Sequence, residues 1–328
     1  MNELRTLLSA TTARVLAEAS GKPANAVWHA IAEAGLNKVL VSEDAGGFGG
    51  TWEDALAVIQ PCGTHATNAP LPEAILATHL AQAANLTLPD SMITIAAHAE
   101  GTLTQNSFSG TLRFVPWGRD ASHVLTALGE TLILLAIADA KIEQHQNPAS
   151  EPRDTLTFTN APAQSANLAT DLLADLALLR TAQIAGALEQ ALALSVQYTR
   201  ERKQFGRALA QFQAIQQQLA ILAEETAAAN MAAAAAFAAK DKGDAAFEIA
   251  AAKLRANRAA RASTGIAHQV HGAMGFTAEY QLHPLTTRLW AYQTEAGNER
   301  HWAEKLGKQI AQRGAKNFWP DLVARAER

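Results

Sequence analysis

The spacing of apolar side chains divides the chain into three parts. Residues 1–95 carry apolar positions at helical spacing, such as Trp28 and Ile31, and predict an N-terminal helical domain. Between 96 and 165 the pattern changes to short runs rich in Thr, Val, Ile and Leu, separated by polar segments. These runs predict a small middle β-domain. From 166 to 328 the helical pattern returns, and a bundle of about four long antiparallel helices is the economical packing.

Two local patterns refine this picture. Residues 221–262 are very rich in alanine, which favours helices and lets neighbouring helices approach closely. The apolar run Val39-Leu40-Val41 predicts a short strand inside the first helical part, just before the glycine-rich segment 43–55. The order helical, β, helical places the chain in the α+β class.

Charge and cysteine content exclude several classes of protein. The 328 residues include 27 Lys and Arg against 31 Asp and Glu, a formal charge of −4. This balance gives no electrostatic reason to expect a nucleic acid or an anionic membrane as partner. Cys62 is the only cysteine, so an intramolecular disulfide framework or a multi-cysteine zinc site is impossible. The N-terminus does not resemble a secretion signal and no run of 18 apolar residues occurs, which predicts a soluble cytoplasmic protein.

The common chemical motifs are missing or weak. The glycines at 46–50 lack the spacing of a nucleotide-binding loop, and neither G-x-S-x-G nor H-E-x-x-H occurs. His268 and His271 are three residues apart, but a metal would need further ligands, so we expect no metal site. An arginine stripe at the same spacing is most often a solvated helix face, with phosphate binding as the alternative; it consists of Arg255, Arg258 and Arg261.

Two segments are more specific. In YTRERKQFGRALAQFQAIQQQLA (198–220), Gln204-Phe205-Gly206 interrupts two helices, and an arginine lies on either side of the break. A cation at such a corner can pair with a phosphate. In HQVHGAMGFTAEYQLHP (268–284), glycines end a helix and would allow backbone amides to approach a ligand closely.

These segments identify a family resemblance. The motifs R-x-Q-F-G and F-Q-A-I-Q-x-x-L-A, followed about 65 residues later by Q-V-H-G-A-M-G-F-T-A-E-Y, resemble the acyl-CoA dehydrogenase family in order and spacing over most of 180–300. The turn E-D-A-G-G-F-G-G near residue 46 resembles the family's leading helical domain. The resemblance implies an N-terminal helical domain, a middle β-domain and a C-terminal four-helix bundle that hold FAD between domains and between subunits. It also implies an acyl-CoA substrate, a homo- or heterotetramer and an electron-transfer flavoprotein as electron acceptor.

The resemblance also assigns cofactor contacts. Arg202 matches the arginine that contacts the FAD pyrophosphate of a neighbouring subunit, Phe205 the aromatic near the adenine side, and Gln213 a further cofactor contact. A second stretch matches the segment that wraps the adenosine diphosphate part, with alanine in place of its second glycine. It consists of Gln269, Val270, His271, Gly272 and Ala273.

The catalytic base departs from the family pattern. The reaction removes a proton α to a thioester while hydride leaves the β-carbon, and a carboxylate must reach that proton. An ungapped match of residues 292–298 places Ala296 where the family has glutamate, and Glu295 lies one residue earlier. The alternative family position for the base, on the first bundle helix, falls on Leu176, which is next to Asp175. Glu295 is therefore the candidate base.

The middle domain departs from the family too, and three functions stay open. The flavin-contacting Trp-Ile-Thr stretch is replaced by Phe114-Val115-Pro116-Trp117, where Trp117 could stack on flavin or belong to the core.

The first hypothesis for the function is an FAD-dependent acyl-CoA dehydrogenase, or a subunit of one, for fatty acids or steroid side chains. The second is a non-catalytic partner that completes the FAD site of another chain. The third is a binding module that kept the fold without the cofactor.

Overall fold

Four helices form the N-terminal part of the molecule. A computed structural model describes residues 3–327. The helices are α1 (Glu3–Glu18), α2 (Ala24–Glu33), α3 (Trp52–Thr64) and α4 (Leu71–Ala83), with single 3-10 turns η1 (Leu36–Lys38) and η2 (Glu43–Ala45) between α2 and α3. Thr51 and Asp54 form a capping box at the start of α3. The carboxylate of Asp241, the last residue of α6 (Gln213–Asp241), accepts a hydrogen bond from the Trp52 amide at 2.7 Å. This bond joins the start of α3 to the helical bundle.

The strand predicted at Val39–Val41 is wrong. This segment forms turns, and the amides of Gly49 and Gly50 donate to the carbonyls of Val41 and Val39 at 2.8 and 2.9 Å. A Cβ on Gly47 would lie 2.2 Å from the Val41 carbonyl oxygen. The glycine-rich segment therefore folds back onto the apolar run and takes the backbone partners that a neighbouring strand would have supplied.

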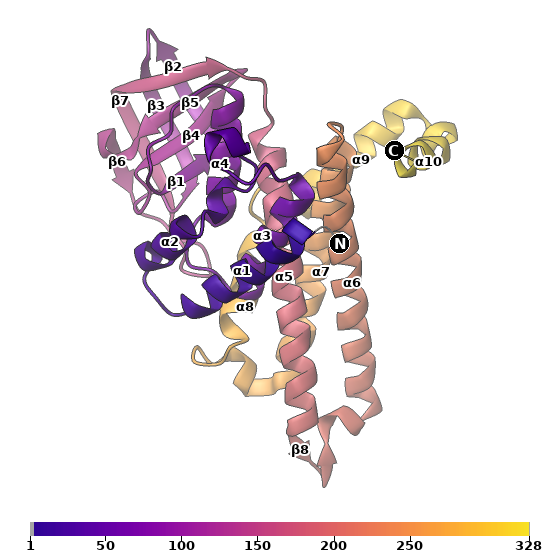
Figure 1. Cartoon of the computed structure of the whole chain (residues 1–328). Coiled ribbons are helices and arrows are strands. Elements are labelled where there is room, and N and C mark those ends of the chain that lie inside the picture. Colours follow the sequence, from indigo (N-terminus) through magenta and orange to yellow (C-terminus); the bar gives the residue numbers. More distant parts are fainter. Residues whose placement is uncertain (1–2, 328) are drawn as a thin grey trace.

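A curled, mainly antiparallel sheet lies beside these helices (Figure 1). Its order is β1-β4-β5-β7-β3-β2, with β6 paired to β7, and only the pairing of β1 with β4 is parallel. The long strand β7 pairs with both halves of the sheet, so it joins them into one layer. The strands are β1 (Ile93–Ala96), β2 (His98–Thr104), β3 (Ser107–Pro116), β4 (His123–Leu128), β5 (Thr131–Ala136), β6 (Ala140–Glu143) and β7 (Arg153–Asn167); η3 (Ile137–Asp139) precedes β6.

The remaining elements build the helical bundle. They are α5 (Leu172–Glu201), α6 (Gln213–Asp241), α7 (Ala246–His271), α8 (His283–Tyr292), α9 (Glu299–Arg313) and α10 (Phe318–Ala326), with short elements β8 (Lys203–Gln204), β9 (Arg207–Ala208), η4 (Leu209–Gln211), η5 (Gly272–Phe276) and η6 (Ala315–Asn317). The order of a helical part, a curled sheet and a helical bundle is that of the expected α+β class.

A close helix crossing fixes the bundle to the N-terminal helices. A Cβ on Gly186 of α5 would lie 2.0 Å from the Gln60 carbonyl oxygen of α3, and one on Gly63 would lie 1.9 Å from the Gln183 carbonyl oxygen. Only glycine allows the two backbones to approach this closely. The crossing therefore holds α5 directly against α3.

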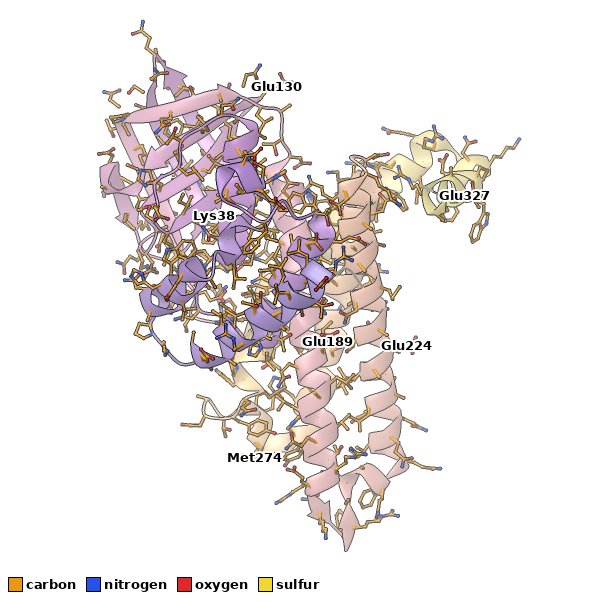
Figure 2. All side chains as sticks on the ribbon, viewed as in Figure 1. Lys38, Glu130, Glu189, Glu224, Met274 and Glu327 are labelled. Carbon is orange, nitrogen blue, oxygen red and sulfur yellow. The ribbon has the colours of Figure 1, made fainter. Side chains whose placement is uncertain are left out.

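The bundle extends far beyond the sheet. In Figure 1 its lower end, marked by β8, projects away from the sheet, and Figure 2 places Met274 near that end and Glu130 at the opposite, sheet end. We call the lower end the distal end. Within residues 3–327 no helix is both long and apolar enough to cross a membrane.

Candidate functional site

The first group of predicted residues lies at the distal end. Arg202 caps the C-terminus of α5, the β8–β9 hairpin reverses the chain, and Gln213 opens α6. Phe205 lies at the tip of the hairpin with a φ of +50° and is 92% exposed. Its ring makes an edge contact with Phe212, at 6.3 Å between centroids, and most of its surface stays unpacked within one protomer.

The second group ends α7 at the same place. The His271 ring lies 4.6 Å from the Tyr198 ring of α5, centroid to centroid, so the C-terminal ends of the two helices are adjacent. Gln269, Gly272 and Ala273 are exposed, whereas the Val270 side chain is buried and could offer only its backbone. We name both groups together the distal cluster: Arg202, Phe205, Gln213, Gln269, Val270, His271, Gly272 and Ala273.

The distal cluster has the chemistry of a diphosphate site. Within residues 3–327 the side chains of Arg202, Gln213 and Gln269 donate no hydrogen bond. His271 Nδ1 lies 2.8 Å from the Ala267 carbonyl, but its Nε2 is buried without a partner. A Cβ at Gly272 would meet no atom within 4 Å, so the turn is open on its outer side. Free donors around an open turn suit a bound polyanion such as the FAD pyrophosphate.

Glu295 lies at the other end of the bundle, beside a cavity of about 520 Å³ between the sheet and the helices. Its carboxylate is held by three donors. Arg153 Nε donates to Oε1 at 2.8 Å, Arg180 Nε to Oε2 at 2.9 Å, and Asn147 Nδ2 to Oε1 at 2.9 Å. Burial alone would raise the pKa of Glu295, but the charges of the two arginines outweigh it and hold that pKa far below its usual range.

These contacts belong to a larger buried network. Arg180 also donates to Glu73 of α4 at 2.6 Å, and Arg153 donates to Glu151 at 2.8 Å. Arg288 and the Tyr292 hydroxyl donate to Glu151 at 2.8 and 2.9 Å. Three arginines and three glutamates balance in charge, so the carboxylate of Glu295 is part of a satisfied structural network.

At the two positions where the resemblance places the base, residues 3–327 offer no second free carboxylate. Ala296, at the family's usual base position, has a φ of +52°, and its carbonyl accepts from Trp302 Nε1 at 3.0 Å. Leu176 lines the cavity, but Asp175 is bound to Lys240 Nζ of α6 at 2.5 Å. Glu295 is the only acidic side chain among the described residues that line the cavity. The assignment of Glu295 as base stays a prediction, and the ion pairs weaken it because they lower its affinity for a proton.

Buried polar contacts also shape the loop that carries Glu295. The Lys253 ammonium donates to the Tyr292 carbonyl at 2.8 Å and to the Gly297 carbonyl at 3.3 Å. Its third bond, of 2.6 Å, goes to Asn257 Oδ1. Three acceptors match the three protons of a charged lysine. Burial lowers the pKa of Lys253 to about 7.

The middle domain contributes one wall of the cavity. Trp117 is buried in the core, whereas Phe114 is 69% exposed, lines the cavity and has a φ of +56°. Sequence reasoning found this segment but singled out Trp117 instead of Phe114, and it missed the two arginines that hold Glu295. One signal was present: Arg180 is the only basic residue in the largely apolar run 172–188, where a charge is expected to find a buried partner.

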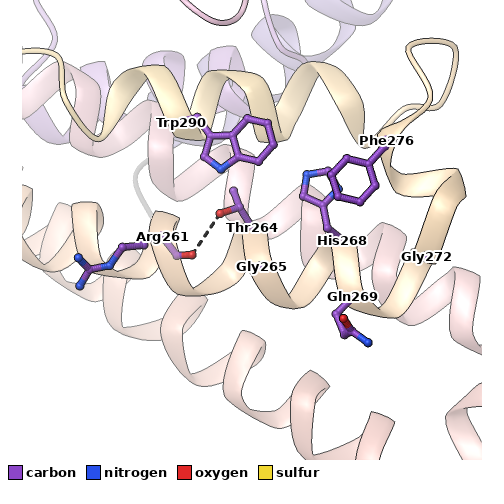
Figure 3. Close-up of a pocket in the computed structure, with 8 residues that line it drawn as sticks. All are labelled: Arg261, Thr264, Gly265, His268, Gln269, Gly272, Phe276 and Trp290. Carbon is purple, nitrogen blue, oxygen red and sulfur yellow. Dashed lines mark hydrogen bonds between the residues drawn. The ribbon is translucent and has the colours of Figure 1, made fainter.

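A separate groove lies on α7, near the distal end. Figure 3 shows His268 and Thr264 on the side of α7 that faces Trp290 and Phe276, whereas Gln269 points to another side. The His268 ring stacks on Phe276 at 4.1 Å and on Trp290 at 5.2 Å between ring centroids. The groove is lined by Arg261, Thr264, Gly265, His268, Gln269, Gly272, Phe276 and Trp290.

Comparison with known proteins agrees with these features. Residues 166–311 match the family model described as acyl-CoA dehydrogenase, C-terminal domain. The chain is similar to acyl-CoA dehydrogenase IpdE2 of Mycolicibacterium smegmatis, with 29% identity over 295 residues that cover 87% of this chain and 88% of the relative. IpdE2 of Mycobacterium tuberculosis is likewise 29% identical, over 304 residues that cover 86% of this chain and 89% of the relative.

Solved structures share the fold. The Tcur3481–Tcur3483 steroid ACAD superposes with a TM-score of 0.85 at 23% identity, over 94% of this chain and 98% of the other. The ChsE4–ChsE5 complex from Mycobacterium tuberculosis gives a TM-score of 0.86 at 20% identity, over 96% and 99%.

Proposed function

Because this chain belongs to the acyl-CoA dehydrogenase family, we propose that it is a subunit of an FAD-dependent acyl-CoA dehydrogenase. The enzyme would introduce a Cα–Cβ double bond into an acyl-CoA thioester. FAD, when bound, accepts the hydride that leaves the β-carbon.

Whether this chain supplies the catalytic base depends on whether the Glu295 carboxylate is free. A general base needs a carboxylate that is free to reach the substrate and able to keep a proton. Glu295 is held from both of its oxygens by Arg153 and Arg180. We therefore favour a chain that does not supply the base and instead completes the FAD site of a partner subunit.

The distal cluster would make that contribution. Arg180, which holds Glu295, and Arg202 are 22 residues apart on α5 (202 − 180), which at helical rise is about 33 Å. The cavity beside Glu295 and the distal cluster thus lie at opposite ends of one helix. Arg202 and Gln213 are free to bind the diphosphate of a cofactor whose flavin ring lies in the neighbouring protomer.

The relatives suggest the wider setting. One similar structure is described as the ChsE4–ChsE5 complex, and another, which carries the two names Tcur3481 and Tcur3483, is described as a steroid ACAD. A heterotetramer that acts on a steroid-derived or fatty acyl-CoA, passes electrons to an electron-transfer flavoprotein and works in the cytoplasm fits these relatives.

One observation favours a second candidate, in which the chain is a complete enzyme. Glu295 lines the cavity and its side chain keeps 19% exposure. If a substrate in the cavity displaced Arg153 or Arg180, the Glu295 carboxylate would be free to take its α-proton.

Flavin content tests the proposal. We expect the purified chain alone to contain little FAD, and the chain co-expressed with a neighbouring dehydrogenase gene to yield a flavin-containing assembly of both chains. In that assembly Arg202→Ala should lower FAD occupancy. Arg200→Ala, an exposed arginine two residues earlier on α5, is the matched control and should leave occupancy unchanged. Full occupancy in Arg202→Ala, or stoichiometric FAD in the chain alone, would contradict the partner role.

A further inference from the structure

The last helix of the chain is apolar on all sides, yet none of its residues is buried. α10 has the sequence FWPDLVARA, in which only an aspartate and an arginine are charged. Trp319 is 72% exposed, and Val323, one turn later on the same side of the helix, is 52% exposed. A helix that is apolar all round is normally buried. In Figure 1 α10 lies at the C-terminal end of the chain, away from both the sheet and the distal end.

Ion pairs hold the inner side of α10 on the bundle. Arg313 of α9 donates to the two carboxylate oxygens of Asp321 at 2.8 and 2.5 Å. Arg325 donates to Glu248 of α7 at 3.0 Å. These contacts hold α10 in one orientation, in which its outer side is turned to solvent.

A groove of about 550 Å³ lies between α10, the end of α9 and the start of α7. Its apolar wall includes Phe247 of α7, Ile310 of α9, and Phe318 and Leu322 of α10. The groove is far larger than an indole ring. The same helix therefore carries the exposed Trp319 and one wall of a groove that could receive an indole.

We propose that α10 is a contact between two copies of this chain, in which Trp319 of each copy lies in the groove of the other. Because the aromatic side chain and the groove belong to one surface patch, a two-fold axis between the copies fills both grooves at once. Each copy then donates one indole and accepts one, so the contact closes and does not continue into an open-ended series of molecules. A different partner would have to carry both an aromatic side chain and a groove at the same spacing.

Charge and area both fit a second copy. The charged residues that line the groove are two of each sign, so two copies of this surface meet without net repulsion; they are Arg313, Arg325, Asp244 and Asp321. A buried tryptophan removes about 150–250 Å² from solvent, and the wall that covers it loses a similar area, so two reciprocal contacts bury roughly 600–1,000 Å². A specific interface needs about 1,000 Å², and the exposed Val323 beside Trp319 adds to the buried area.

Sedimentation of the purified full chain tests the contact. We expect the wild-type chain to dimerise reversibly as its concentration rises. Trp319→Ala removes both indoles from a dimer and should raise the dissociation constant at least about thirtyfold, the loss typical of one central tryptophan. Met231→Ala is the matched control, because Met231 is 71% exposed on α6 but does not line the groove, and it should leave the dissociation constant unchanged. A wild-type chain that stays monomeric up to about 0.1 mM, or equal losses in the two variants, would overturn the proposal.

Mixing two variants tests the reciprocal arrangement. Ala246→Glu places a carboxylate in the groove, and Ala246 is exposed at the first position of α7, where an acidic residue is compatible with the helix. A dimer of either variant alone loses both contacts. A mixed dimer keeps one, with Trp319 of the Ala246→Glu copy in the unblocked groove of the Trp319→Ala copy. We expect the equimolar mixture to dimerise more tightly than either variant alone, and a mixture that dimerises no more tightly would refute the exchange of indoles.

Assembly with a co-expressed dehydrogenase chain distinguishes the second copy from another partner. If Trp319→Ala left self-association intact but prevented assembly with that chain, α10 would bind the other subunit and the proposal would be wrong. The contact does not depend on the chain's being a dehydrogenase subunit. Self-association is measured without flavin, so its failure would leave the Arg202 test of the proposed function intact.

Discussion

Replacing Glu295 by glutamine separates a structural carboxylate from a catalytic one. The change removes one negative charge from a network in which three arginines face three glutamates. Arg153 and Arg180 then share an uncompensated positive charge in a buried place. Removing one partner of a buried ion pair typically costs about 3–5 kcal/mol, so we expect Glu295→Gln to lower the free energy of unfolding by about that amount.

Urea unfolding, followed by circular dichroism and tryptophan fluorescence, measures this loss. Glu304→Gln is the matched control, since Glu304 pairs with Arg300 on the exposed face of α9 at 2.7 Å, and it should not change the midpoint measurably. Adding Arg180→Gln to Glu295→Gln restores the charge balance. The double variant should therefore lose less stability than the sum of the single variants, by roughly 1–3 kcal/mol.

The pH dependence has a defined sign. The pKa of Glu295 is lower in the folded chain than the ordinary value of 4.5, so its stabilisation is fully present above pH 4.5 and is lost as the pH falls below it. The difference between wild type and Glu295→Gln should shrink in acid. If instead Glu295→Gln unfolds at the wild-type midpoint and abolishes substrate bleaching of the flavin in the assembled enzyme, Glu295 is the base and the ion-pair argument fails.

Three further predictions follow from buried groups. Burial lowers the pKa of Lys253 to about 7, so between pH 7 and about 10 the unfolded chain binds more protons than the folded chain. The free energy of unfolding of the wild type should therefore rise with pH, relative to Lys253→Met, by up to about 1.4 kcal/mol per pH unit. Parallel curves of stability against pH for the two proteins would disprove this. Gly186→Ala should lower the free energy of unfolding in urea by at least about 1–3 kcal/mol, because its Cβ would lie 2.0 Å from the Gln60 carbonyl oxygen. Gly265→Ala is the control: its Cβ would meet no atom within 4 Å, so this variant should be as stable as the wild type. Burial raises the pKa of the Cys62 thiol, so this thiol should react with a disulfide reagent only as the chain unfolds, and rapid reaction in the native protein would contradict its burial.

The fold was largely predictable because the signals that define it are local. The long helices α5, α6 and α7 follow from apolar spacing, and the strands follow from short runs rich in β-branched residues. The strand expected at Val39–Val41 failed because a glycine segment nearby in sequence took its backbone partners. Periodicity records which side chains are apolar, but it does not record which backbone groups pair.

The site was less predictable because its chemistry depends on contacts between distant residues. The sequence marked Glu295 as an acid near the expected base position, but its arginine partners are 142 and 115 residues away along the chain. Arg202 and Phe205 were accessible to prediction because their motif lies within one short hairpin. The prediction that they bind a cofactor still depends on the resemblance, since one protomer shows only that they are free.

The distribution of satisfied polar groups connects these observations. Beside the cavity, Glu73, Glu151 and Glu295 all have charged partners, so a ligand that needs one of them must break an existing ion pair. Near the distal end, His268 and His271 keep buried ring nitrogens without partners. Because unmet buried polar groups are costly, a ligand that bonded these ring nitrogens would gain hydrogen bonds, whereas a ligand that bonded Glu295 would first have to break ion pairs. On the proposed partner role, Ala296→Glu alone should not create a base. The new carboxylate would meet Arg153 and Arg180 already neutralised by Glu295. We therefore expect the flavin in the assembled enzyme to bleach no faster at this subunit's cavity than in wild type.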